Sequence, residues 1–558
     1  MRCRPTGVPM KIGVPMDKTG DVPAVTERAR DVLNQFRSRL CKHVATRCGD
    51  GRQDSDQHLV HGLAWYATSV QAFEAAANWM ARTQRDGSPG AAGDIAGRIL
   101  LGELLAECRG GIAMHQLEII RPQDFGLPKD DLDLFEDPAI VRLIAEANAP
   151  ELRGQLVDLL SQSGAGVEAF GLEFDIDALA MAREMRRFAN TEITPHAHGW
   201  HVENLYIPEN VVEGLANLGV FGISVAEHHG GSGASKIAMC AITEELSHAY
   251  IGTGSLGTRS EIAAELIQTG GRADQKAHFL PKIACGDILP AAAFTEPEAG
   301  SDLGAVRCRA VRDGDEYVIN GSKIWITHAA RSDLLTLLVR TDPGITGYRG
   351  LSMLLLEKPR GDDANPFPLA GMSGSEIEVI GYRGMKEYEI GFDNVRVPAS
   401  ALLGAVEGQG FRQLMQTFET ARIQTAARAT GVTRAALDLA LDYARQRRQF
   451  GKSLMAFPRV SNKIIKMCTE VLAARLLTFA AARAKDEGRR CDLEAGMAKL
   501  YAAKAAWSAA DGAVQIYGGN GFAVESPVSR ILCDARILSI FEGAAEIQAQ
   551  IIARRLLE

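Results

Sequence analysis

The chain has 558 residues, of which 46% are hydrophobic and 23% charged, and its formal net charge is -8 at pH 7. This length predicts several domains rather than one core, and the composition is that of an ordinary globular protein. The negative charge argues against a nucleic-acid-binding surface. No apolar run reaches the length of a membrane span, so we expect no membrane-spanning segment.

The ten cysteines are scattered along the chain. They form no CxxC pair and no Cys/His cluster with the spacing of a zinc site, so we expect reduced thiols in a cytoplasmic protein and no metal site. Residues 1–25 lack the apolar core of a signal peptide. This stretch is predicted to be a disordered leader.

Residues 26–165 are predicted to form an N-terminal helical extension, because apolar side chains recur there at helical spacing. His58, His61 and His115 are better explained as solvated or structural residues than as metal ligands, since no further ligands accompany them. The polar, glycine-containing stretch 161–166 (SQSGAG) is a plausible linker.

A second helical domain is expected over residues 170–290. Within it, Arg259, Glu261 and Glu265 interrupt a helix that is otherwise small and apolar. One interpretation is surface charge with local pairing, which is common and weak. The other is that Arg259 is a buried cation at the wall of a pocket.

Residues 291–405 alternate with period two and are rich in β-branched residues, which predicts a β domain with strands at 334–340, 351–357 and 388–397. The stretch 316–327 is predicted to be two strands joined at Asn320-Gly321, a dipeptide that favours a type I′ hairpin turn. Residues 406–558 return to long amphipathic helices, typical of a bundle. The order helix, sheet, helix indicates an α+β fold, and no GxGxxG follows a strand to indicate a nicotinamide site.

A carboxylate stands out near the C-terminal end, in the stretch 540–548 (IFEGAAEIQ). Glu542 lies between an aromatic residue and a glycine, after an apolar segment. A desolvated glutamate has a raised pKa, which suits it to proton abstraction. The alternative is a glutamate at the N-terminus of a helix, stabilised by the helix dipole.

Five motifs give this carboxylate a context. They are 294–302 (FTEPEAGSD), 323–327 (KIWIT), 447–451 (RRQFG), 515–521 (QIYGGNG) and 541–543 (FEG). Their order and spacing resemble the acyl-CoA dehydrogenase family over about residues 170–558. The resemblance implies a helical domain, a β-barrel-like middle domain and a C-terminal four-helix bundle, here with an extra N-terminal helical domain. It also implies an FAD-dependent enzyme that oxidises an acyl-CoA thioester.

The resemblance assigns roles around the flavin ring residue by residue. Phe294 and Thr295 would contact its pyrimidine side. Trp325 and Thr327 would flank the dimethylbenzene and N5 side. Ser301 would lie along the path of the substrate or its CoA.

A second group would reach the FAD of a neighbouring subunit. Arg447 and Phe450 belong to it, and the forked guanidinium of Arg447 is suited to the pyrophosphate. Gln515, Gly518 and Gly519 would cradle the adenine dinucleotide, again across a subunit boundary. These contacts imply a homo-oligomer.

Glu542 matches the catalytic base of most of the family and would take the α-proton, while the β-hydride passes to flavin N5. The α-proton of a thioester is weakly acidic, so its removal needs a positioned base and a stabilised enolate. The thioester site would be formed at Glu542 and Gly543. The next residue is Ala544 where the family often has Thr or Ser, so a hydroxyl contact to the cofactor is absent.

The extension, together with the stretches 257–262 and 372–384, resembles members that oxidise a branched dicarboxylyl-CoA in the ethylmalonyl-CoA pathway. The free carboxylate of such a substrate needs a cation or several donors once water is excluded. Arg259 is the first candidate because the matching segment lines the acyl pocket in relatives. Arg422 is the second.

Two alternatives stay open. One is a branched-chain or glutaryl-type acyl-CoA dehydrogenase, and the other is a non-catalytic flavin-binding scaffold. In relatives, electron-transferring flavoprotein reoxidises the flavin, so we expect it as the electron acceptor. We also expect a homodimer, because the bulky extension would block the usual dimer of dimers.

Overall fold

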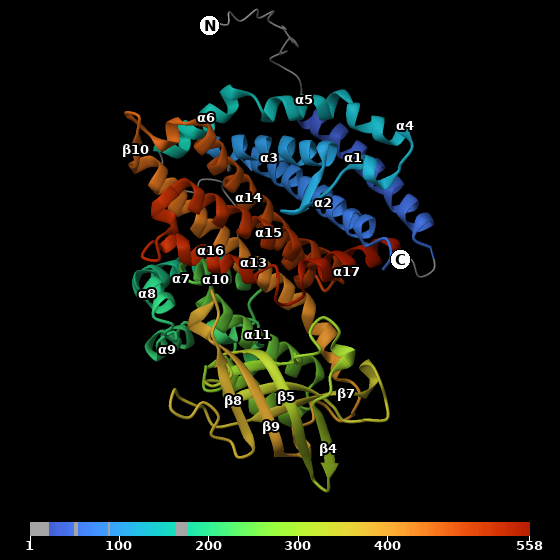
Figure 1. Cartoon of the computed structure of the whole chain (residues 1–558), viewed down its shortest axis with the longest axis vertical. Coiled ribbons are helices and arrows are strands. Elements are labelled where there is room, and N and C mark those ends of the chain that lie inside the picture. Colours follow the sequence, from blue (N-terminus) through green and yellow to red (C-terminus); the bar gives the residue numbers. More distant parts are fainter. Residues whose placement is uncertain (1–21, 50–53, 87–89, 163–175) are drawn as a thin grey trace, which may run out of the picture.

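The computed structural model describes residues 22–49, 54–86, 90–162 and 176–558. The N-terminal helices lie at one end of the long axis, the β-sheet lies at the other, and the C-terminal helices lie between them (Figure 1). Most of the expected leader 1–25 and of the expected linker 161–166 lies outside the described residues. Helix α1 begins at Val22, so residues 22–25 are helical rather than part of a leader.

The N-terminal region is helical, as predicted, around an aromatic core in which the ring of Tyr66 packs edge-on against Phe125. It also contains a short β-hairpin that the helical spacing did not reveal. The elements are α1 (Val22–Arg47), α2 (Gln57–Asp86), α3 (Gly90–Gly110), β1 (Ile112–His115), β2 (Glu118–Ile120), α4 (Lys129–Leu132), α5 (Pro138–Ala147) and α6 (Pro150–Gln162).

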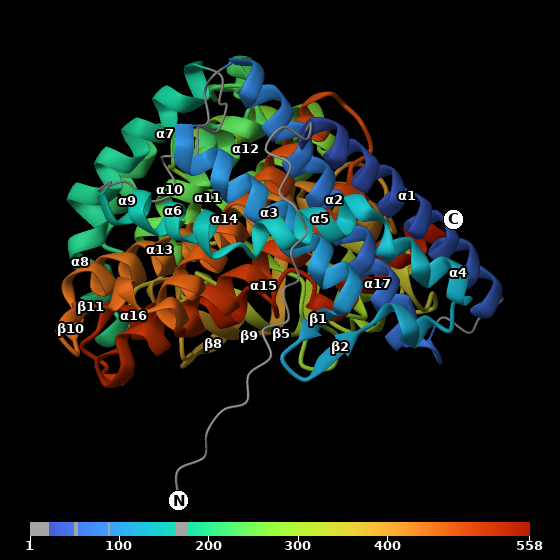
Figure 2. The ribbon, with the colours of Figure 1, turned by 90° about the horizontal axis from the view of Figure 1, so that it is seen from above.

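This N-terminal region packs directly on the C-terminal helices, as the view from above shows (Figure 2). The interface contains partly buried polar contacts as well as apolar ones. Lys466 Nζ lies 2.6 Å from Glu107 Oε1, and Lys504 Nζ lies 4.9 Å from the centre of the Trp65 ring. These contacts between individual side chains fix the orientation of the N-terminal region on the C-terminal helices.

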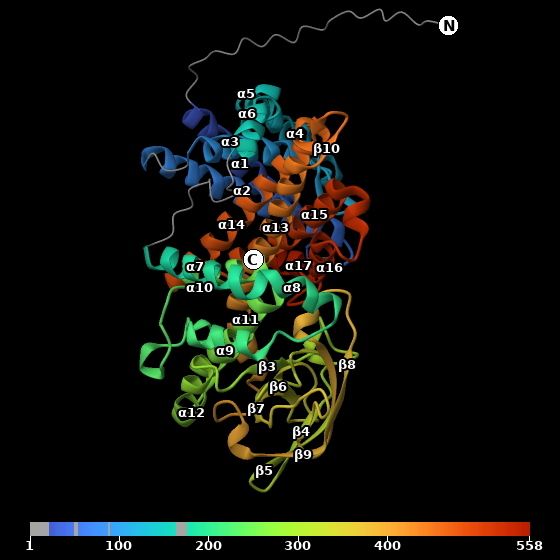
Figure 3. The ribbon, with the colours of Figure 1, turned by 90° about the vertical axis from the view of Figure 1, so that its left-hand side faces the viewer.

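The second helical region comprises α7 (Ile176–Phe188), α8 (Thr194–Val202), α9 (Glu209–Asn217), α10 (Lys236–Ala249), α11 (Ile251–Gly270) and α12 (Ala273–Ala284). Helices α10 and α11 run between the C-terminal helices and the sheet (Figure 3). Most residues of both helices are buried, since each is covered on several sides. The charged side chains noted on α11 are therefore interior groups.

Seven strands form the sheet, in the order β3-β6-β4-β5-β9-β8 with β7 beside β6. Strands β6 and β7 are almost wholly buried, which explains their continuous apolar runs. The strands are β3 (Pro290–Ala293), β4 (Arg309–Asp313), β5 (Glu316–Thr327), β6 (Leu334–Arg340), β7 (Leu351–Glu357), β8 (Met372–Ile377) and β9 (Glu387–Pro398).

The predicted hairpin at Asn320-Gly321 is wrong, because 316–327 is one continuous strand, β5. Gly321 has φ +141 and marks a shift of register against β9, which is a bulge. A Cβ there would lie 2.7 Å from the Cα of Cys308, so close backbone approach requires the glycine. The turn between β4 and β5 is made at Gly314, with φ +61.

The C-terminal region is the predicted helical bundle, interrupted by a small hairpin. Its elements are α13 (Gly410–Gln446), β10 (Arg448–Gln449), β11 (Lys452–Ser453), α14 (Pro458–Asp486), α15 (Asp492–Tyr517), α16 (Pro527–Ile537) and α17 (Ala545–Leu557). Many alanines on these helices are fully buried, which allows close approach of the backbones. Within the described ranges, no helix is long and apolar enough to cross a membrane.

A buried ion network joins the second helical region to this bundle. Arg434 on α13 lies 2.8 Å from Glu244 and 2.6 Å from Glu245, both on α10. Arg475 on α14 donates to Glu244 from the other side. The side chains of all four residues are no more than 6% exposed. Buried charges of this kind must stay paired.

We expect Arg434→Leu to lower the thermal midpoint of the holoenzyme, since it leaves buried Glu245 with Arg186 alone and buried Glu244 with Arg475 alone, a loss of up to about 3–5 kcal/mol. Arg396→Leu is the control: Arg396 pairs with Asp313 and Glu316 on the surface, and its loss should cost at most about 1 kcal/mol. Similar shifts of the midpoint in the two variants would contradict a structural role for the network.

Candidate active site

Glu542 lies in the short loop between α16 and α17, in a strained backbone conformation. Its φ is +53, and that of Gly543 is +91. Residues with such angles persist only where the surrounding structure holds them, and they cluster at functional sites. Lys499 Nζ donates to the Gly543 carbonyl at 2.6 Å, and Gln548 Nε2 donates to the Glu542 carbonyl at 3.2 Å. The loop is thus held from α15 and from α17.

The Glu542 carboxylate is enclosed by cations. Arg259 Nη2 on α11 and Arg428 Nη2 on α13 each lie 2.7 Å from its Oε1. The hydroxyl of Thr425 donates to Oε2. The Glu542 side chain is 13% exposed and that of Arg428 is 0% exposed. Three separate segments of the chain therefore meet at this one carboxylate.

The expected raised pKa of Glu542 is wrong for this state of the protein. Burial by itself raises the pKa of Glu542, but the guanidiniums of Arg428 and Arg259 outweigh it and hold the pKa below the ordinary value of 4.5. The carboxylate is therefore firmly ionised. A base held so tightly by two cations is a weak base until they are engaged elsewhere.

Arg259 is a buried cation, with its side chain only 10% exposed. The interpretation of this helix as a charged surface is wrong, since Glu261 and Glu265 are buried too. They pair with lysines from other helices: Glu261 with Lys236, and Glu265 with Lys485 at 3.3 Å. Arg259 is left to face Glu542.

Arg422 is also buried, at 8% exposure. It forms no hydrogen bond or ion pair with another residue in the part of the chain that the structure describes, and its guanidinium lies 5.7 Å from the centre of the Phe418 ring. Burial lowers the pKa of Arg422, although Asp492 and Glu419 oppose the effect. A buried cation without a paired anion is costly, so this position favours binding of an anion.

Phe294 and Thr295 lie directly after β3, where their backbone is held firmly. Lys323 is fully buried, and its Nζ donates to the Phe294 carbonyl at 3.0 Å and lies 2.8 Å from Glu296 Oε1. The Ile324 N–H donates to the Thr295 carbonyl at 3.0 Å. The two residues predicted at the flavin ring thus lie beside the 323–327 motif.

Trp325 is 53% exposed and has φ +60, at an irregularity in the pairing of β5 with β9. A large aromatic side chain presented in this way is typical of a ligand platform. Nearby Thr327 is buried, and its hydroxyl donates to Glu387 Oε1 at 2.8 Å. Burial raises the pKa of Glu387 to about 7, although Thr327 and Arg259 oppose it. The charge of Arg259 thus acts on Glu387 as well as on Glu542.

The structure does not bring the remaining predicted residues to Glu542. Ser301 lies exposed in the turn after β3, and Arg447, Phe450, Gln515, Gly518 and Gly519 lie exposed on the C-terminal bundle. Asn520 donates to the hydroxyl of Tyr443 at 3.0 Å, which brings the turn after α15 to the end of α13 before Arg447. This second group forms one open surface, and its role toward a neighbouring subunit stays a prediction.

Sequence reasoning missed four residues of the site: Arg428, Thr425, Lys499 and Glu387. A signal existed for the first two, because Arg422, Thr425 and Arg428 recur every three residues and therefore share one side of α13. Lys499 sits in an alanine-rich helix and Glu387 at a strand start, and neither position carries a sequence signal.

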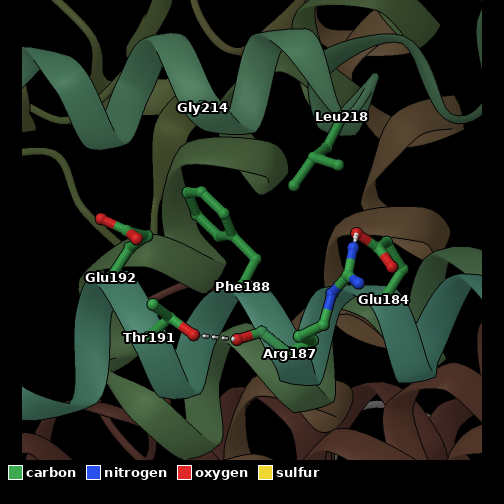
Figure 4. A pocket seen from close by; sticks show the side chains of 7 residues that line it. All are labelled: Glu184, Arg187, Phe188, Thr191, Glu192, Gly214 and Leu218. Atoms are coloured by element: carbon green, nitrogen blue, oxygen red, sulfur yellow. Dashed lines mark hydrogen bonds and ion pairs between the residues drawn. The ribbon is translucent and has the colours of Figure 1, made fainter.

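A separate hollow of about 280 Å³ lies between α7 and α9 (Figure 4). Phe188 and Leu218 point into it, and Arg187 pairs with Glu184 at its edge. A Cβ on Gly214 would lie 2.6 Å from the Phe188 ring, so the ring packs on bare backbone. None of the residues around Glu542 lines this hollow, and it is not part of the candidate site.

Family models match three consecutive parts of the chain. They are "Acyl-CoA dehydrogenase, N-terminal domain" at residues 177–287, the middle domain of the same family at 291–395 and its C-terminal domain at 408–557. The (2S)-methylsuccinyl-CoA dehydrogenase of Cereibacter sphaeroides is 54% identical over 548 residues, covering 97% of each chain.

Two solved structures are also similar to this chain. Butyryl-CoA dehydrogenase from Megasphaera elsdenii superimposes with a TM-score of 0.65 at 32% identity, covering 69% of this chain and 100% of its own. A chain in the structure of the electron transferring flavoprotein of Acidaminococcus fermentans superimposes with a TM-score of 0.66 at 31% identity, covering 69% and 99%. Both leave about a third of this chain uncovered.

We expect Arg428→Gln to raise the pKa of Glu542, because it removes the cation that lowers this pKa most. Activity that needs the carboxylate should then fall off at a higher pH, so the acid limb of kcat/KM for an uncharged acyl-CoA moves upward. Arg412→Gln is the control, since Arg412 is an exposed residue of the same helix. An unmoved acid limb in Arg428→Gln would contradict the assignment of the ion pair.

Proposed function

Because the chain belongs to the acyl-CoA dehydrogenase family, we propose that it oxidises (2S)-methylsuccinyl-CoA to mesaconyl-CoA with Glu542 as the base. The observation that carries the proposal is a cluster of three arginines: Arg259 and Arg428, which pair with Glu542, and Arg422, which is buried on the same helix as Arg428. Cations at this place suit an acyl group that carries its own carboxylate. The similarity to the Cereibacter sphaeroides enzyme over 97% of both chains, extension included, supports the same substrate.

The enzyme is an FAD-dependent oxidoreductase, as the family is, and its residues fit this cofactor. Trp325 offers an exposed aromatic side chain beside Thr327. At Gly518 and Gly519 a Cβ would meet nothing within 4 Å, so their backbone is open to a diphosphate. We propose that these residues hold FAD together with Phe294, Thr295, Arg447, Phe450 and Gln515. Bound FAD supplies the hydride acceptor of the reaction.

Glu542 would remove the α-proton and also help to hold the thioester. Its backbone N–H donates to no other residue within the described ranges, so it can donate to the thioester oxygen as negative charge develops there. The strained loop aims both the N–H and the side chain of one residue at the substrate. Burial excludes water, which strengthens both interactions.

The substrate carboxylate would release the base. Arg259 and Arg428 bind Glu542 in the free protein, and Arg422 has no ion-pair partner within the described ranges. A substrate anion that enters the cluster offers these cations an alternative partner. Burial then dominates at Glu542 and raises its pKa toward the range that suits a general base. Substrate recognition and activation of the base are thereby the same event.

A homodimer and electron-transferring flavoprotein are the proposed partners. Phe450 and Phe522 are 92% and 89% exposed on the surface formed by the hairpin and the 515–522 turn, which suits a subunit interface. Similarity to a chain in the structure of an electron transferring flavoprotein supports that class of electron acceptor. The domain limits given above and a cytoplasmic location stay predictions from the sequence.

We expect anaerobic (2S)-methylsuccinyl-CoA to bleach the flavin absorbance of the purified enzyme, and Glu542→Gln to abolish the bleaching. The panel includes glutaryl-, isobutyryl-, isovaleryl- and butyryl-CoA. Preferential bleaching by an uncharged or longer acyl group would favour the branched-chain or glutaryl-type alternative. A yellow protein that no acyl-CoA bleaches would favour the flavin-binding scaffold.

Arg259→Met should raise KM for (2S)-methylsuccinyl-CoA by about tenfold or more, since it removes a charge-assisted hydrogen bond to the substrate anion. KM for butyryl-CoA should change little, because that acyl group has no anion to lose. Arg259→Lys keeps the positive charge but loses the forked guanidinium. Its KM for (2S)-methylsuccinyl-CoA should therefore lie between those of the wild type and Arg259→Met. Equal losses on both substrates would rule out Arg259 as the carboxylate receptor.

A further inference from the structure

Helix α17 connects the N-terminal extension to the active-site loop. It begins at Ala545, directly after the 542–544 loop, and packs between α2 of the extension and α15 of the bundle. Its buried residues include Ala549 and Ile552. The family models begin at residue 177, so α2 is an element that this chain adds to the family fold. The helix that follows the base is therefore held in part by residues outside that fold.

One polar contact ties α2 to α17. His61 Nε2 lies 3.1 Å from Gln550 Oε1, with both side chains partly buried. The Nε2–H tautomer of His61 donates to this amide oxygen. His58, one turn earlier on α2, is exposed, and its side chain forms no hydrogen bond or ion pair with another described residue. Of the two histidines, only His61 forms a hydrogen bond to α17 within the described residues.

A second contact carries the position of α17 to the base. Gln548 is fully buried, and its Nε2 donates to the Glu542 carbonyl at 3.2 Å. Its amide also lies over Gly543, where a Cβ would come within 2.2 Å of it. Gln548 and Gln550 belong to the same turn of α17, so a shift of this turn moves the backbone at Glu542.

Because Glu542 has a strained backbone conformation, its position depends on the hydrogen bond from Gln548. A non-glycine residue at positive φ relaxes when the contacts around it loosen. The carboxylate must also keep its position toward the α-carbon of the bound substrate, and displacements of about 1 Å can cost orders of magnitude in rate. Lys499 holds the loop from α15, and Gln548 is the matching support from α17.

We propose that His61 of the N-terminal extension is a positioning residue for Glu542, acting through Gln550 and the first turns of α17. The extension then has a part in the reaction itself, since it keeps the base in its reactive geometry. The inference rests on the proposed function of Glu542 as the base. It does not depend on which acyl group is the substrate.

The test compares His61→Ala with His58→Ala in the full-length holoenzyme. Amide hydrogen exchange over residues 538–550 reports the loop without any turnover, and kcat, KM and the pH profile of kcat/KM report the base. For His61→Ala we expect faster exchange in this segment and a kcat lower by about fivefold to tenfold, with KM almost unchanged. The acid limb of kcat/KM should move upward as the carboxylate moves away from the arginines.

Two further variants separate positioning from general damage. His61→Gln keeps a donor at similar reach and should restore both exchange and kcat, while Gln550→Ala should reproduce His61→Ala. His58→Ala should match the wild type. Unchanged exchange and an unchanged pH profile in His61→Ala would overturn the inference, and so would faster exchange throughout the molecule. Turnover that survives Glu542→Gln would instead overturn the proposed base, whatever the exchange data show.

Discussion

The ion pairs between Glu542 and the two buried arginines, Arg259 and Arg428, are the constraint on which the site depends. They join α11, α13 and the loop before α17, three segments far apart in the chain. Taking three charges out of water is costly unless each stays close to its counterpart. The backbone at Glu542 accepts a strained angle to meet them, and Lys499 and Gln548 hold it there.

The direction of the pKa shift at Glu542 could not be predicted from the sequence. An apolar segment and a neighbouring aromatic residue correctly indicated a carboxylate removed from water. The cations that reverse the consequence of burial lie on α11 and α13, and only the fold brings them within 2.7 Å. Strands 334–340 and 351–357 were predicted with the observed limits because they are buried on both faces, a condition that is written in the local sequence.

The wrong prediction of a hairpin turn at Asn320-Gly321 also arose because the local sequence does not show which contacts the fold creates. Asn320-Gly321 is a turn signal when the glycine is needed for a reversal of the chain, and here the glycine is needed for a bulge against Cys308. Both uses demand the same residue, so the local sequence cannot separate them. The family motifs were better guides than local propensity at Glu542 and at Trp325, where the backbone departs from regular structure.

Under the proposed function, the arginine cluster would let one site prefer a charged acyl group without simply binding it more tightly. In the free protein, two arginines of the cluster are already paired with Glu542. A substrate with a carboxylate would exchange one anion for another, so the gain in binding would be moderated while the base became free. An uncharged acyl group would leave Glu542 paired and therefore poorly basic. Discrimination of this kind acts on the chemical step, where interactions present only in the reacting complex have their full effect on rate.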